Sequence, residues 1–84
     1  MTNKIEVLEV FNLSNKIIFV VKFEGDKYLI NDKYQNFENN LAFILKGVGM
    51  ENNPNSESKS ILVEILNENY SLEDFKDKIF IKKD

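Results

Sequence analysis

The stretch that decides the fold is VLEVFNLSNKIIFVVKFEGDKYLINDKY, residues 7–34. It alternates runs rich in β-branched and aromatic residues with short polar turns, a pattern typical of consecutive antiparallel strands. Ser14-Asn15 predicts a tight hairpin turn because Asn tolerates positive φ, and Gly25 supplies the permissive position of the next turn. The expected strands cover residues 5–13, 17–23 and 28–30, and the last ends at the turn signal Asn31-Asp32.

The first expected strand is apolar on both faces. By simple alternation one face would carry Ile5, Val7, Phe11 and Leu13, and the other Leu8 and Val10. Such a strand is either central in a sheet or interrupted by a bulge that switches its faces. The sequence leaves both alternatives open.

The rest of the chain also favours strands. Residues 41–48 contain good helix formers, but Gly47 and Gly49 leave little room for a stable helix, so we expect a strand there. Residues 35–40 and 51–60 are polar, which predicts loops, exposed in the second case. Two further strands are expected over residues 60–66 and 78–82.

One helical turn is expected near residues 71–77. In Ser71-Leu72-Glu73-Asp74 the Ser71 hydroxyl can accept a hydrogen bond from the Asp74 amide, and the acidic residues lie at the positive end of the turn. Leu72 and Phe75 would anchor this turn to the core.

Together these elements predict an all-β fold, a small antiparallel barrel of five to six strands with one short helical turn. The chain has 84 residues, which indicates a single domain over 1–84. It has no cysteine, so disulfides cannot stabilise it, while seven Phe and three Tyr provide large side chains for a core. Barrel closure also removes exposed strand edges.

The missing residue types argue against catalysis. The chain contains no His, Cys, Trp or Arg, since all eleven basic residues are Lys. It therefore lacks the usual general base near neutral pH, the common zinc and copper ligands, and the bidentate group that binds phosphate or guanine. We expect no enzyme activity, no cofactor and no catalytic, cofactor-binding or metal-binding residues.

Two groups of acidic residues are the only candidates for a cation site. Asp26 and Asp32 flank an expected strand, and Glu73, Asp74 and Asp77 lie close together in the sequence. The ligand spacing of an EF-hand is absent. Turn formation and helix capping explain these acids better than metal binding does.

Aromatic and basic residues offer a second alternative, stacking of single-stranded nucleic acid. The aromatic candidates are Tyr28, Tyr34, Phe37 and Phe43, with Lys22, Lys27, Lys33 and Lys46 available beside them. So small a chain needs its aromatic residues in the core, and the net charge is −3 with a pI of about 4.9. Nucleic acid is therefore not the expected partner.

The order of motifs resembles the second domain of the translational GTPases, the barrel of elongation factor Tu and its relatives. Val7–Leu13 is similar to the family's opening (I/V)-x-D-V-F-x-I segment, and Ile30–Asp32 lies where the family has Val-Gly-Asp. Further similar segments are Gly47–Met50, Ile61–Leu66, Glu73–Lys76 and Ile79–Ile81, so that the likeness covers roughly residues 5 to 82. No P-loop is present, so the resemblance implies the barrel fold and not a GTPase activity.

These observations lead to three functional hypotheses. The first is a non-catalytic barrel that binds a protein partner or a second copy of itself, through an exposed apolar strand or an unclosed edge. The second is a stand-alone, translation-associated barrel that binds RNA or a ribosomal surface. The third and weakest is a carboxylate-dependent hydrolase or cation-binding protein. No segment has signal-peptide or transmembrane length, so we expect a cytoplasmic location and no membrane partner.

Overall fold

Six antiparallel strands close into a barrel in the computed structural model, which describes residues 3–25, 29–49 and 58–83. The strands are β1 (Lys4–Leu13), β2 (Lys16–Glu24), β3 (Lys33–Gln35), β4 (Ala42–Val48), β5 (Ser58–Ile65) and β6 (Ile79–Lys83), with a 3₁₀ helix η1 (Leu72–Phe75) before β6. Their order around the barrel is β1-β2-β5-β4-β3-β6, and β6 closes it by pairing with both β1 and β3. The expected all-β barrel is thus confirmed.

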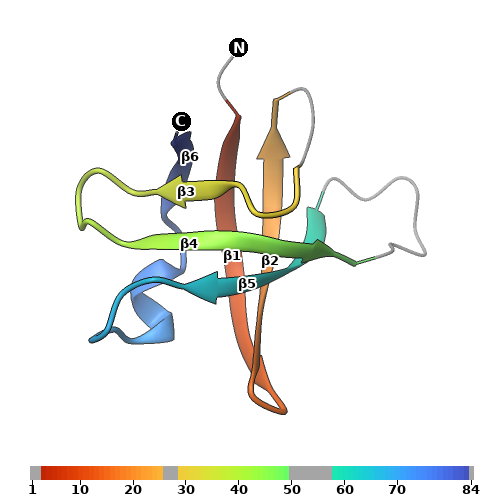
Figure 1. Ribbon diagram of the computed structural model, residues 1–84, viewed down its shortest axis with the longest axis vertical. Helices are drawn as coiled ribbons and strands as arrows, with labels where there is room; N and C mark the ends of the chain where they lie inside the picture. The colour runs from red at the N-terminus through yellow and green to blue at the C-terminus, as the bar shows by residue number, and fades with distance from the viewer. Residues whose placement is uncertain (1–2, 26–28, 50–57, 84) are drawn as a thin grey trace.

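In Figure 1 the long β1–β2 hairpin lies behind β3, β4 and β5, which pass across it in this view. Its tip extends beyond the other elements, at the lower end of the view. The tip is a two-residue turn in which Ser14 and Asn15 have φ of 51° and 67°. Two successive positive φ values characterise the type I′ turn, whose twist matches that of the flanking strands. The hairpin expected from Ser14-Asn15 is confirmed.

A bulge interrupts β1 between Val7 and Glu9, where its register with β2 shifts by one residue. Ile5 and Val7, before the bulge, are fully buried, whereas Phe11 and Leu13, after it, are exposed. Of the two alternatives for this strand, the bulge is correct. The simple alternation that grouped Phe11 and Leu13 with Ile5 and Val7 is wrong, because the extra residue reverses the faces.

The third strand lies later than expected. Leu29 and Ile30, expected in a strand, precede a turn in which the Asp32 N–H donates to the Leu29 carbonyl at 3.2 Å. Asn31 has a φ of 77°, the value required at the third residue of a type II turn. The strand itself covers Lys33–Gln35, and Tyr28 lies outside the described residues.

One other boundary differs from expectation and lies partly outside the described residues. Of the expected loop at 51–60, residues 51–57 are outside the described ranges, but Ser58–Ser60 pair with β2 and belong to β5. Cross-strand pairing overrides the weak β-propensity of these polar residues. The expected strand over residues 41–48 is confirmed as β4.

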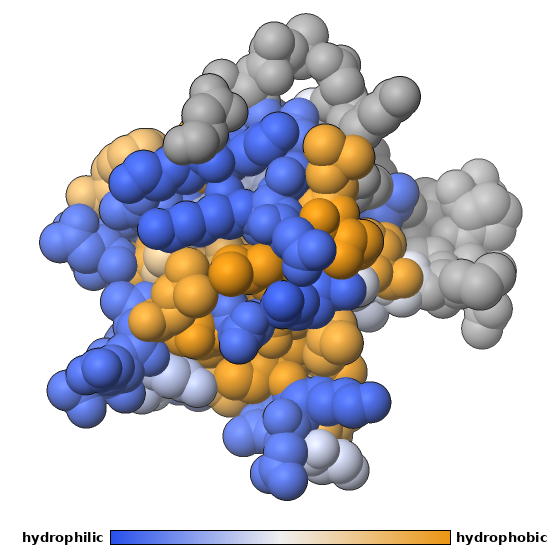
Figure 2. Space-filling model, viewed as in Figure 1, coloured by the Kyte–Doolittle hydropathy of each residue, from blue (hydrophilic) through white to orange (hydrophobic). Residues whose placement is uncertain are grey.

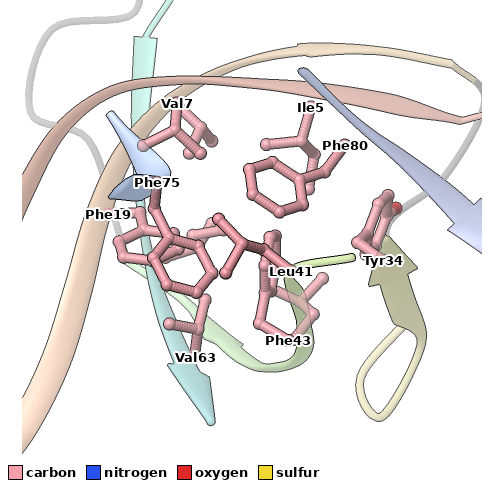
Figure 3. Packing of buried hydrophobic residues seen from close by; sticks show 12 residues of the cluster. Ile5, Val7, Phe19, Tyr34, Leu41, Phe43, Val63, Phe75 and Phe80 are labelled. Carbon is pink, nitrogen blue, oxygen red and sulfur yellow. The ribbon is translucent and has the colours of Figure 1, made fainter. Parts of the chain in front are cut away.

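The five largest fully buried side chains are aromatic, and they come from β2, β3, β4, η1 and β6 (Figure 3). Phe43 lies 5.4 Å from Phe19, 5.7 Å from Tyr34 and 5.0 Å from Phe80 between ring centroids. Phe75 stacks on Phe80 at 5.6 Å, so η1 closes one part of the barrel with an aromatic ring. Aromatic pairs at these distances add stability beyond their buried area.

The helical turn is shorter than expected but lies in the expected place. The Asp74 carboxylate accepts a hydrogen bond from the Ser71 N–H at 3.2 Å, while the Asp74 N–H donates to the Ser71 carbonyl oxygen at 2.9 Å. Phe75 is fully buried and Leu72 packs against the core, as expected for the two anchors. η1 ends at Phe75 with Lys76 as its C-cap, and Asp77 turns the chain into β6 with a φ of 62°.

Candidate protein-interaction surface

An apolar row crosses the outer face of the barrel over β1, β2, β5 and β4. Phe11 pairs with Ile18, Ile18 with Leu62, and Leu62 with Gly47. Paired residues of neighbouring strands share a face, so these three side chains lie side by side. Phe11 is 43% exposed, and Ile18 and Leu62 are half-buried. We call Phe11, Ile18 and Leu62, together with Leu13, the outer apolar row.

Leu13 extends the row toward the tip of the hairpin. It lies two residues beyond Phe11 on the same face of β1 and is 57% exposed. Gly47 carries no side chain, so β4 leaves Leu62 uncovered from that side. In Figure 2, orange apolar atoms run from β4 across β5 toward the arms of the β1–β2 hairpin, with blue polar atoms between and around them.

Charged residues surround this row and pair with one another. Lys76 Nζ lies 3.2 Å from Glu9 Oε1, and Lys46 Nζ lies 3.5 Å from Glu64 Oε2. The hydrogen bond and the charge of Glu9 raise the pKa of Lys76 above its ordinary value. A shallow hollow of about 460 Å³ lies beside the row, between Lys16, Leu62 and Tyr70. Apolar residues inside a charged rim are the usual composition of a protein–protein interface.

The edge of β1 differs along its length. Lys4–Glu6 pair with β6, Val7 exchanges hydrogen bonds with the 77–78 segment, and Glu9 contacts Lys76. Within the described ranges, residues 10–13 pair with β2 on one side and with no strand on the other. The barrel is closed, yet this end of β1 retains an open edge.

The aromatic candidates for nucleic-acid stacking do not form a platform. Tyr34 and Phe43 are fully buried in the core, as the core-packing interpretation expects. Phe37 is 68% exposed and follows β3. Tyr28 lies outside the described residues.

The lysines expected beside them are spread over the surface. Lys46 contacts Glu64 and donates to the Asn31 side-chain oxygen at 3.3 Å, and Lys22 lies on β2, away from β3. Lys33 is directly opposite Lys83, which places two exposed ammonium groups together on the outer face of β3 and β6. Lys27 is outside the described ranges.

Most of the acidic candidates that the structure describes have structural roles. Asp32 ends the Leu29–Asp32 turn, and its Oδ2 lies 3.6 Å from Lys82 Nζ. Asp74 caps η1, while Glu73 is exposed. Asp26 is not described. Among the residues that are, no three metal-ligating side chains converge on one point.

Sequence reasoning missed the outer apolar row because it placed Phe11 and Leu13 on the buried face. The signal in the sequence is the pair of adjacent apolar residues Val7-Leu8, which marks the position of the bulge.

Family models, curated proteins and solved structures were each compared with the chain, and none gives a match. The described residues form no helix with the length and hydrophobicity that a membrane crossing requires.

Proposed function

We propose that this chain is a non-catalytic barrel that binds another protein through the outer apolar row. The observation that supports the proposal is the exposure of Phe11 and Leu13 on a strand whose first half is buried. An apolar side chain left in water gains about 25 cal/mol for each Å² that a partner covers. Phe and Leu side chains within a charged rim are therefore suited to protein contact.

Two further features support binding over catalysis. Asp74 caps η1, and Glu9 and Asp32 form ion pairs with lysines, so these three acids have structural roles. The hollow beside the row is shallow, and Leu62, a member of the row, is one of the residues that line it. A surface of this kind suits a protein partner better than a small substrate, which prefers an enclosed pocket.

The proposal is tested by affinity capture from a cell extract treated with nuclease. The bait is the wild-type chain, compared with the double variant Phe11→Lys/Leu13→Lys and with Phe37→Lys as the matched control. Phe37 is more exposed than either residue but lies after β3, away from the row. We expect a protein that the wild type and Phe37→Lys retain and the double variant loses. Equal capture by all three chains would overturn the proposal.

RNA or a ribosomal surface is the alternative ligand, and two observations favour it. One is the resemblance of the sequence to the second domain of translational GTPases, which stays a prediction. The other is the placement of Lys33 opposite Lys83, which concentrates positive charge on an otherwise acidic chain. RNA binding predicts an affinity that falls steeply as salt is added. It also predicts that the double variant Lys33→Gln/Lys83→Gln binds RNA more weakly than the wild type. Capture that survives nuclease and high salt would argue against it.

A further inference from the structure

The open edge of β1, residues 10–13, has backbone groups directed away from the barrel. The two-residue turn makes Leu13 and Lys16 the closing hydrogen-bonded pair of the hairpin. Hydrogen-bonded and non-hydrogen-bonded pairs alternate along an antiparallel ladder, so Phe11 also bonds to β2. The N–H and C=O groups of Val10 and Asn12 therefore point to the open side.

This edge lacks the usual protection against pairing with another strand. Natural edges carry lysine, proline or a bulge, which keep other strands away. Residues 10–13 are Val-Phe-Asn-Leu, and the bulge of β1 lies before them, at Leu8. Phe11, Asn12 and Leu13 are all exposed. An edge of this composition favours the addition of a strand.

We propose that this edge pairs with the same edge of a second copy of the chain, antiparallel, about a twofold axis at Phe11. This inference rests on the proposed function, because it names the partner of the outer apolar row. Val10 and Asn12 of one copy exchange hydrogen bonds with Asn12 and Val10 of the other. The result is a sheet that continues from one barrel into the next.

The second copy fits because the edge is complementary to itself in this register. Phe11 faces Phe11 of the second copy in a non-hydrogen-bonded pair, where side chains approach most closely. Glu9 lies opposite Leu13, so no two like charges face each other, and Lys76 already neutralises Glu9. A twofold contact uses the same patch on both copies, as this one does.

Sedimentation equilibrium of the purified chain tests the inference. We expect a monomer–dimer equilibrium for the wild type and for Phe37→Lys. Phe11→Lys and Phe11→Glu, each alone, should weaken the dimer at least about tenfold because two like charges then face each other. An equimolar mixture of these two variants should recover the dimer, since Lys then faces Glu. The mixture recovers the dimer only if the side chain at position 11 of one copy lies opposite the side chain at position 11 of the other.

A second pair of variants tests the backbone hydrogen bonds. Asn12→Pro removes an outward N–H without removing a bond to β2, so it should abolish dimerisation. Asn12→Thr keeps the N–H and should dimerise as the wild type does. Circular dichroism checks that each variant is folded; if Asn12→Pro is unfolded, the charge-pair mixture decides the question alone.

Failure of this inference differs visibly from failure of the proposed function. A wild type that stays monomeric overturns the inference, and so does a dimer that persists in Phe11→Lys or is not recovered by the mixture. The proposed function stands in each of these cases if the extract still yields a protein that depends on Phe11 and Leu13. A partner retained equally by wild type and Asn12→Pro would show a different protein bound to the row, without strand pairing.

Discussion

Gly25 shows how a single backbone conformation constrains this sequence. Its φ is 144°, a region that essentially only glycine occupies, and an added Cβ would approach the Asn3 Cα to 2.9 Å. Gly25→Ala should therefore lower the free energy of unfolding by about 1–3 kcal/mol. Gly47→Ala is the control, since its Cβ would meet only Leu62 Cβ at 3.7 Å, an ordinary contact.

Urea denaturation measures both glycine variants. Gly47→Ala should stay within about 0.5 kcal/mol of the wild type. Equal destabilisation by the two variants would show that the loss comes from added volume in the sheet and not from the backbone of Gly25.

The Glu9–Lys76 ion pair joins β1 to the end of η1. Its contribution to the stability of the fold should be lost as pH rises through the alkaline range. Glu9 raises the pKa of Lys76 in the folded state above its ordinary value of 10.5. A raised lysine pKa contributes stability below the unfolded-state value, and this contribution is lost as pH rises through the folded-state value. The melting temperatures of wild type and Glu9→Gln should therefore differ at neutral pH and converge above the lysine titration.

Salt and a matched acid provide the controls for this ion pair. The pair is exposed, so the difference should be small and should shrink as salt is added. Glu68→Gln removes an exposed carboxylate that has no ion pair among the described residues, and its melting temperature should track that of the wild type. A difference between wild type and Glu9→Gln that persists at strongly alkaline pH would contradict the assignment.

At the scale of elements, the β1–β2 turn does not have the sequence that best stabilises its backbone conformation. Ser14 and Asn15 both have positive φ, and Asn-Gly is the preferred sequence for such a turn. Ser14→Asn/Asn15→Gly should raise the free energy of unfolding by about 0.5–2 kcal/mol. Asn15→Ala should lower it by about 1–2 kcal/mol, because alanine pays the steric cost of this conformation. Thermal melts that shift the same way for both variants would exclude the type I′ assignment.

The elements also show what could and could not be read from the sequence. The hairpin turn at Ser14-Asn15, the turn at Gly25 and the short helical turn that Phe75 anchors follow from local chemistry, and the sequence predicts each of them in its place. The expected position of β3 is wrong because Leu29 and Ile30 have strand propensity, whereas Asn31 turns the chain. In this segment the described hydrogen bonds to β4 begin at Asn31 and Asp32, which bond to Leu45, and continue into Lys33–Gln35. Pairing of this kind is a property of the whole barrel and leaves no local signal.

The candidate surface was harder to predict than the fold, for a related reason. The exposure of Phe11 and Leu13 depends on whether the bulge falls before or after them, and one residue of register moves both side chains to the other face. The open edge at residues 10–13 depends in turn on where β6 ends its pairing with β1, at Glu6. The sequence predicts an exposed apolar strand or an open edge without naming its residues, and protein binding through such a surface stays a prediction.

At the scale of the molecule, stability depends on aromatic residues that connect strands distant in the sequence. Phe43 of β4 contacts rings from β2, β3 and β6. It therefore links the two walls of the barrel, the β1–β2 hairpin and the β3–β4–β5 side. Truncating a buried phenylalanine to alanine costs about 3–5 kcal/mol, while small domains are stable by only about 5–15 kcal/mol. Phe43→Ala should therefore remove much of the stability of a chain that has no disulfide to compensate.

Guanidinium denaturation of Phe43→Ala and Phe37→Ala tests this dependence. Phe37→Ala removes the same atoms from an exposed position and should leave the transition midpoint almost unchanged. Because Phe43 joins both walls, its loss should lower the midpoint of the single transition and not split it into two. A second transition would mean that the β1–β2 hairpin and the β3–β4–β5 side unfold separately. The aromatic cluster would then not be the one core that holds the outer apolar row in place.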